Sequence, residues 1–133
     1  MATATRTVTV TDANFDQTVE KGITLIDFWA AWCGPCRAFA PVFEAAAARH
    51  PDVVFGKVDT EAEPGLAREF EIAAIPTLMV LRDGVMLGAQ AGVMSARAID
   101  DLIRQVAALD MDAIRATIAA RDAAEAPGAA AAP

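Results

Sequence analysis

The sequence predicts an α/β sandwich with a sheet in the middle, and three observations support this fold class. Strand-like and helix-like segments alternate along most of the chain. Residues 23–30 (ITLIDFWA) are almost continuously apolar, which is typical of a strand buried on both faces. Asp83-Gly84 lies between two strand-like runs, and this dipeptide is typical of a tight hairpin.

The first predicted elements are a strand, a helix and the buried strand 23–30. Valine and threonine alternate over residues 7–11, as in a short strand with one apolar face. Thr11 or Asp12 is expected to cap a helix that ends near Lys21, because either side chain can accept a bond from a free backbone N–H.

A longer helix follows, then a strand over residues 53–58 and a short helix that begins at Pro64. The longer helix is expected to end near Arg49 and to kink at Pro41, since proline removes one backbone donor. Its apolar residues have helical spacing: Phe39, Val42, Phe43, Ala46 and Ala47.

The hairpin strands 77–81 and 85–91 precede a helix that Ser95 is expected to cap. These elements form one predicted domain over residues 1–109. Its last helix presents four apolar residues: Ile99, Leu102, Ile103 and Val106.

The C-terminal region differs from this domain. Residues 110–124 predict an extra helix, and the Ala/Pro-rich residues 125–133 predict a disordered tail. We expect the helix to dock on the domain's own surface, with recruitment of a partner as the alternative. The docking stripe consists of Met111, Ile114 and Ile118.

Composition excludes several classes of protein. The net charge is -7, from 18 acidic and 11 basic residues, which argues against a nucleic-acid or acidic-membrane binder. The longest run without a charged residue covers 84–96, shorter than the roughly 20 residues of a membrane span. The N-terminus MATATRTVTVTD has no secretory signal pattern, so a cytoplasmic location is expected.

The chain's two cysteines lie together in Trp32-Cys33-Gly34-Pro35-Cys36, between the buried strand and the longer helix. Residues three apart share a helix face, so the two sulfurs can form a disulfide. Cys33, at the helix N-terminus, meets free N–H groups that stabilise a thiolate, which makes it the expected nucleophile. Cys36, one turn further, is expected to be more buried and to resolve the mixed disulfide.

Asp27 is the polar exception in the apolar strand 23–30. Burial of a carboxylate is costly and raises its pKa, so Asp27 is a candidate functional residue. Lys57 lies at the equivalent end of the next predicted strand and could interact with it.

From about Thr5 to Leu109 the sequence resembles the thioredoxin family. DFWAAWCGPCR matches the family's active-site strand and helix start, and Ile75-Pro76-Thr77 matches its proline loop. The resemblance implies a thioredoxin-like three-layer α/β/α sandwich with a central mixed sheet. Further matching positions are Asp27, Pro41, Lys57, Gly84 and Gly92.

The resemblance also implies roles. Cys33 attacks, Cys36 resolves, and Asp27 is an acid/base that helps deprotonate Cys36 through water. Gly34, Pro35 and Lys57 support them, and the bond before Pro76 is expected to be cis. The implied client-docking surface is Trp32, Ile75, Pro76, Ala91, Gly92 and Val93.

The implied protein is a monomeric thiol-disulfide oxidoreductase that reduces client proteins and is re-reduced by thioredoxin reductase. It needs no bound cofactor beyond the reversible Cys33–Cys36 disulfide. Two departures from the family are Arg37, in place of a common lysine, and Ala31, in place of a polar residue.

Four alternatives remain open. The cysteines could be half of a zinc site, although zinc needs four ligands and the chain offers only His50 besides the two cysteines. His50 is otherwise expected to be a surface residue at the end of a helix. They could be a static disulfide, or belong to a net oxidant. From another class, the chain could be a docking, assembly or holdase module with incidental redox activity.

Overall fold

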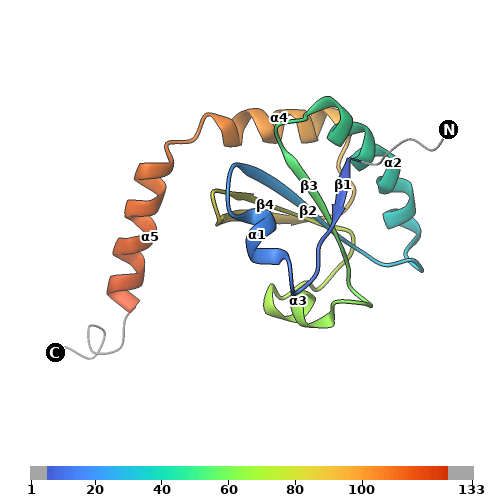
Figure 1. The fold of residues 1–133 in the computed structure, drawn as a ribbon, viewed down its shortest axis with the longest axis horizontal. Coiled ribbons are helices and arrows are strands. Elements are labelled where there is room, and N and C mark those ends of the chain that lie inside the picture. Colours follow the sequence, from blue (N-terminus) through green and yellow to red (C-terminus); the bar gives the residue numbers. More distant parts are fainter. Residues whose placement is uncertain (1–5, 126–133) are drawn as a thin grey trace.

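The computed structural model describes residues 6–125 and has ten elements (Figure 1). They are β1 (Thr7–Thr9), α1 (Phe15–Val19), β2 (Ile23–Trp29), α2 (Gly34–Arg49), β3 (Val54–Asp59), α3 (Pro64–Glu69), β4 (Thr77–Arg82), β5 (Val85–Ala91), α4 (Ala96–Ala107) and α5 (Met111–Glu125). Except for Glu125, the predicted disordered tail lies outside the described residues. Within the described part of the chain, no helix has the length and apolar character needed to cross a bilayer.

The five strands form one mixed sheet in the order β1-β3-β2-β4-β5. β1, β3 and β2 are parallel, while β4 is antiparallel to β2 and β5 is antiparallel to β4. β2 therefore lies at the centre, and the middle five of its seven residues are buried, as the apolar run predicted. The predicted α/β sandwich with a central mixed sheet is confirmed.

Successive side chains of each strand point to opposite faces of the sheet, so the core has two layers. On one face, Leu25 of β2 packs in a cluster with residues of α2 and α4. On the other face, Ile26 packs in a cluster with residues of α1 and α3. Gly56 of β3 is required on the second face, because a Cβ there would lie 2.6 Å from Val10 Cγ2 and 2.8 Å from Ile26 Cδ1.

The predicted hairpin turn is confirmed. Asp83 and Gly84 have φ angles of 52° and 81°, the left-handed values that a two-residue turn between twisted strands requires. The Asp83 carboxylate also accepts a hydrogen bond of 2.8 Å from the Gly22 N–H, which ties the hairpin to the start of β2.

The predicted cap of α1 is wrong. The helix begins only at Phe15, and neither Thr11 nor Asp12 caps it. Asn14 is the reason: its Oδ1 accepts from the Thr11 N–H at 2.8 Å and its Nδ2 donates to the Thr9 carbonyl at 2.9 Å. The side chain thus holds the backbone in a turn after β1, and the helix starts beyond this turn. Ser95, by contrast, caps α4 as predicted, accepting from the Ala98 N–H at 3.1 Å.

Candidate active site

Cys33 is the N-cap residue of α2, and Cys36 lies in the first turn of the helix. The two cysteines form a disulfide, with their Cα atoms 5.2 Å apart. Pro35 fits between them because the first helical positions do not need an N–H donor. The Cys36 N–H donates to Cys33 Sγ at 3.2 Å. A backbone donor and the positive end of the helix dipole therefore both stabilise negative charge on Cys33 sulfur when the disulfide is open.

Burial distinguishes the two sulfurs less than expected. Cys33 is 5% exposed and Cys36 is 3% exposed, so the predicted difference is slight. They form a buried cluster with Ala30, against which the partly buried Trp29 and Ile75 pack. The capping position of Cys33, more than its exposure, separates the two cysteines chemically.

The proline loop lies beside the sulfurs. The Ile75–Pro76 peptide bond is cis, as the resemblance implied. Cys33 Sγ is 3.7 Å from the Ile75 carbonyl oxygen. The Gly92 N–H donates to the Pro76 carbonyl at 2.8 Å, and Gly92 has a φ of 100°, which favours glycine. This bond holds the loop after β5 beside the loop before β4.

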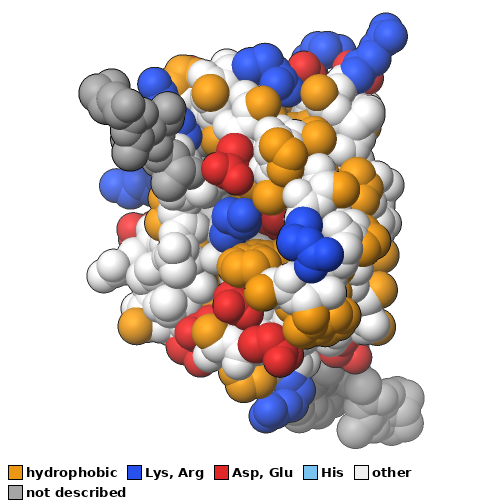
Figure 2. Space-filling model, turned by 90° about the vertical axis from the view of Figure 1, so that its right-hand side faces the viewer, with side chains coloured by type: hydrophobic (Ala, Val, Ile, Leu, Met, Phe, Trp, Pro, Cys, Tyr) orange, Lys and Arg blue, Asp and Glu red, His pale blue; other side chains and the backbone are white. Residues whose placement is uncertain are grey.

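The residues expected to contact clients are mostly accessible. Trp32 is 67% exposed and Val93 is 52% exposed. Ala91 and Gly92 are exposed, and Ile75 is half-buried, whereas Pro76 is buried and can offer a client only its backbone. A hollow of about 190 Å³ lies between Trp32 and Ile75. Figure 2 shows the side that carries α2 and the loop leading into it, where hydrophobic side chains form groups separated by charged ones.

Asp27 lies in the middle of β2 and is fully buried. It alternates with Leu25, so its side chain is on the sheet face that α2 covers. Burial raises the pKa of Asp27 to about 6, and the nearby Lys57 ammonium partly opposes this rise. Among residues 6–125, neither carboxylate oxygen has a hydrogen-bond partner.

Lys57 is paired with Asp27 in the β2–β3 register, as the sequence suggested. It has a second contact that sequence reasoning missed: its Nζ lies 5.1 Å from the centre of the Trp29 ring. Trp29 is two residues from Asp27 and therefore on the same face of β2. The Lys57 ammonium is therefore stabilised by the aromatic face of Trp29 and, at longer range, by the charge of the Asp27 carboxylate.

Two further side chains have roles that the sequence did not reveal. Arg37 donates to the Ala31 carbonyl at 2.8 Å, so the residue that replaces the family's lysine fastens the active-site loop. His50 is half-buried, lies 2.7 Å from Asp100 and stacks on Phe55. The hydrogen bond from His50 lowers the pKa of Asp100, and Arg49 adds to this effect.

The position of His50 also excludes a zinc site made of His50 and the two cysteines. His50 follows the last residue of α2, about 25 Å along the helix from Cys33, so the three residues cannot share one ion. Over residues 6–125, no group of three or more His, Cys, Asp or Glu side chains is arranged to hold a metal.

Comparisons with known proteins agree with this geometry. A family model described as Thioredoxin matches residues 6–108. A protein of Streptomyces coelicolor, named provisionally as thioredoxin 2, is 53% identical over 120 residues, which cover 90% of each chain. Thioredoxin of Staphylococcus aureus is 49% identical over 80 residues, 58% of this chain and 75% of that one.

A solved structure extends the comparison to the fold. Thioredoxin (Mala s 13) of Malassezia sympodialis has a TM-score of 0.67 and 30% sequence identity, and the match covers 79% of this chain and 94% of that one. Together with the disulfide at the start of α2, these relatives favour redox chemistry over the docking or holdase alternative. The chain belongs to the thioredoxin family and is a thiol-disulfide oxidoreductase.

Proposed function

We propose that the chain is a protein-disulfide reductase in which Cys33 attacks and Cys36 resolves. The Cys33 thiolate attacks one sulfur of a client disulfide, forms a mixed disulfide and releases the first client thiolate. The Cys36 thiolate then attacks Cys33 Sγ, closes the Cys33–Cys36 disulfide and releases the second client thiolate. Two electrons pass to the client. The main support for these roles is the Cys36 N–H, which donates to Cys33 Sγ at the N-terminus of α2.

Asp27 is proposed to accept the proton of the Cys36 thiol through water. Its pKa of about 6 is closer to neutral than that of an ordinary carboxyl, so it can both take up and release a proton during turnover. With a pKa of about 6 most of the Asp27 population is ionised near neutral pH, and the charge of Lys57 favours this ionised form. Lys57 and Trp29 are therefore positioning residues, and neither is proposed to touch the client.

The client is proposed to dock as an extended segment over the accessible residues around the disulfide. Trp32, Val93 and Ile75 supply apolar contact area. The backbone of the proline loop supplies hydrogen-bonding groups, because an extended chain can pair with exposed backbone. This explains why the buried ring of Pro76 can still serve docking.

Catalysis needs a supply of electrons but no bound cofactor in this scheme. A thioredoxin reductase is proposed to reopen the Cys33–Cys36 disulfide, which makes the chain an electron carrier between that enzyme and its clients. A net reductase also needs a reducing compartment, so the proposal includes a cytoplasmic location.

Replacing Cys36 with serine tests the order of attack. The variant is expected to accumulate a covalent complex with a disulfide-containing protein, because Cys33 can attack but nothing resolves the mixed disulfide. Nonreducing electrophoresis measures the complex, and dithiothreitol should release it. Cys33→Ser is the matched control and should trap nothing through Cys36, since that sulfur lacks the capping position. Equal trapping by the two variants would contradict the assigned roles.

Equilibration with glutathione tests the direction of the reaction. The midpoint potential of the Cys33/Cys36 pair is expected near about -270 mV, the value known for the C-x-x-C pair of thioredoxin itself, far below the roughly -120 mV of strong oxidants. Trp fluorescence or thiol alkylation reports the oxidised fraction, with Cys33→Ser as the blank. A midpoint near -120 mV, typical of strong oxidants, would instead support a net oxidant.

A further inference from the structure

Two hollows share the segment Ile72-Ala73-Ala74, which leads into the proline loop. The first, of about 190 Å³, reaches from this segment to Trp32. The second, of about 240 Å³, reaches from the same segment to Ala91 of β5. Because Ile75 also lines the first hollow and its carbonyl oxygen is 3.7 Å from Cys33 Sγ, the two hollows form one surface beside the disulfide.

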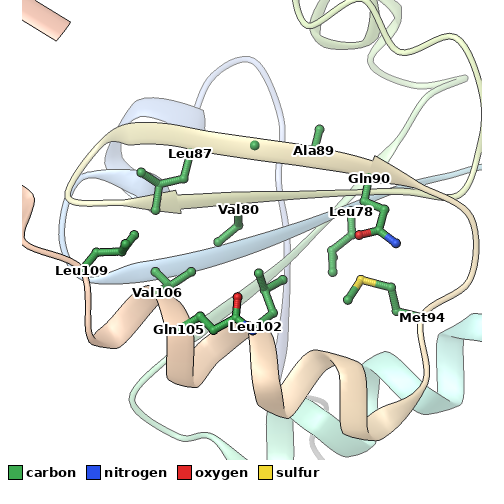
Figure 3. Close-up of a pocket in the computed structure, with 11 residues that line it drawn as sticks. Leu78, Val80, Leu87, Ala89, Gln90, Met94, Leu102, Gln105, Val106 and Leu109 are labelled. Atoms are coloured by element: carbon green, nitrogen blue, oxygen red, sulfur yellow. The ribbon is translucent and has the colours of Figure 1, made fainter. Parts of the chain in front are cut away.

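The second hollow is open because the side chains around it are small. Exposed alanines make up half of its lining: Ala73, Ala74, Ala89 and Ala91. Figure 3 shows a different hollow, of about 320 Å³, along α4, with Leu78 and Gln90 pointing towards α4 and Ala89 pointing away from it. The alanine-lined hollow therefore lies on the face of β5 that α4 does not cover.

A further hollow, of about 450 Å³, lies between α5 and the start of β5. The predicted docking of α5 on its own domain is only partly realised there, since Met111 is buried while Ile114 and Ile118 are half-buried. In the described part of the chain, no residue of the active-site loop or the proline loop lines this hollow or the one along α4. A client held at Cys33 is therefore expected to contact the two smaller hollows.

Glu71 carries the charge of this surface. Among the residues that line the two smaller hollows, the others are apolar except Thr60 and Thr77, and each threonine hydroxyl already donates to a main-chain carbonyl. Glu71 is exposed and makes no ion pair within residues 6–125. Its carboxylate is therefore available to a bound molecule.

The backbone at Glu71 disfavours glutamate. Glu71 follows the C-cap residue of α3 and has a φ of 53°, a left-handed value for which glycine is the usual residue at a helix end. The Glu71 N–H donates to the Arg68 carbonyl at 3.1 Å, which holds this conformation. The Ile72 N–H donates to the Ala67 carbonyl at 2.9 Å and closes the same turn. Since a carboxylate is also unfavourable near the negative end of a helix dipole, a role in binding would explain glutamate at this position.

We infer that Glu71 selects client segments that carry a lysine or arginine close to the attacked disulfide. This inference rests on the proposed function and names the class of client. An extended segment whose cysteine lies at Cys33 points every second side chain towards the protein. The alanine-lined hollow offers room for the aliphatic stem of a basic side chain, and Glu71 in its lining pairs with the charged end.

The overall charge also favours basic clients, so the test must separate a local effect from a global one. The chain has a net charge of -7, which attracts cations over a long range. Glu69 provides the matched control. It is exposed, carries the same charge two residues before Glu71, and lines neither of the two smaller hollows.

Peptide disulfides test the inference. Each is a disulfide-linked homodimer of a short peptide with one cysteine, and it carries lysine, glutamine or glutamate two residues before and two residues after that cysteine. Stopped-flow tryptophan fluorescence measures the second-order rate constant at which each peptide oxidises the reduced full chain. We expect the lysine peptide to react at least about threefold faster than the glutamate peptide at low salt. Salt at about 0.5 M should reduce this ratio.

Charge removal makes the test specific. Glu71→Gln is expected to lower the lysine-to-glutamate rate ratio at least about twofold, while Glu69→Gln should leave it near the wild-type value. Because the ratio compares two peptides on the same variant, a general change in cysteine reactivity cancels. An unchanged ratio in Glu71→Gln, or an equal effect of the two variants, overturns the inference.

Glu71→Gly separates charge from backbone conformation. Glycine adopts a φ of 53° without strain, so this variant should have a higher thermal midpoint than Glu71→Gln. Both variants should lose the preference for lysine to the same extent, and a loss in Glu71→Gly alone would overturn the inference. A wild-type chain that reacts equally with all three peptides overturns only this inference, whereas one that reacts with none contradicts the proposed reductase function as well.

Discussion

Replacing Cys33 with serine is expected to lower the rate of protein-disulfide reduction by at least about three orders of magnitude. Two effects act together. A serine hydroxyl stays protonated near neutral pH, even at the N-terminus of α2 where the Cys36 N–H points at the side chain. Serine oxygen also cannot form the mixed disulfide through which electrons pass to the client. Reduction of insulin by dithiothreitol, followed by turbidity, measures the loss.

The fold should tolerate this change, which keeps the result interpretable. Serine is nearly isosteric with cysteine and is a favourable N-cap residue for α2. Far-UV circular dichroism and the thermal midpoint should therefore match those of the reduced wild-type protein. Full activity in a folded Cys33→Ser variant would remove Cys33 from the mechanism, whereas loss of folding would call for Cys33→Ala as the replacement test.

The strands were predictable because their signals are local. Buried residues run continuously along β2, and Asp83-Gly84 specifies its turn through backbone conformation alone. The start of α1 was not predictable, because several residues near it can cap a helix. Asn14 makes its bonds to Thr9 and Thr11 only in the turn that follows a formed β1.

The residues of the site also differ in whether local sequence predicts them. The cysteine pair and Asp27 are visible in sequence, since the first is a motif and the second is a polar residue in an apolar strand. The contact of Lys57 with Trp29 joins residues 28 apart and depends on the β2–β3 register, so it leaves no local pattern in the sequence. The hydrogen bonds from Arg82 to the main-chain carbonyls of Val106 and Leu109 could not be predicted for the same reason, because they join residues far apart in the chain.

Burial of Asp27 destabilises the folded protein near neutral pH, because its carboxyl must ionise there while it is out of contact with water. Its folded-state pKa of about 6 exceeds the ordinary 3.8, so the folded state binds the Asp27 proton more tightly than the unfolded state does. The free energy of unfolding of the wild-type protein therefore falls as pH rises from about 4 to about 6. At higher pH the titration of Asp27 lowers it no further. A rise from 3.8 to about 6 corresponds to roughly 3 kcal/mol.

Asp27→Asn is expected to abolish this pH dependence, because asparagine has nearly the same shape and does not ionise. The stability of the variant relative to wild type should increase by about 2 kcal/mol between pH 4 and pH 7, whatever constant offset the buried amide adds. Urea denaturation at a series of pH values measures the difference. Equal slopes for the two proteins would show that Asp27 titrates normally.

The same substitution should slow catalysis as well as remove the pH dependence of stability. Without a carboxylate to accept the Cys36 proton, decay of the mixed disulfide near pH 7 is expected to slow by about tenfold or more. The slowing should shrink as pH approaches the thiol's own pKa, because Cys36 then ionises without help. Stopped-flow formation and decay of the mixed disulfide, in a chain that keeps Cys36, separates this step from attack by Cys33. Since a purely structural role for Asp27 predicts a change in stability alone, an unchanged decay rate in a folded Asp27→Asn variant would exclude proton transfer by Asp27.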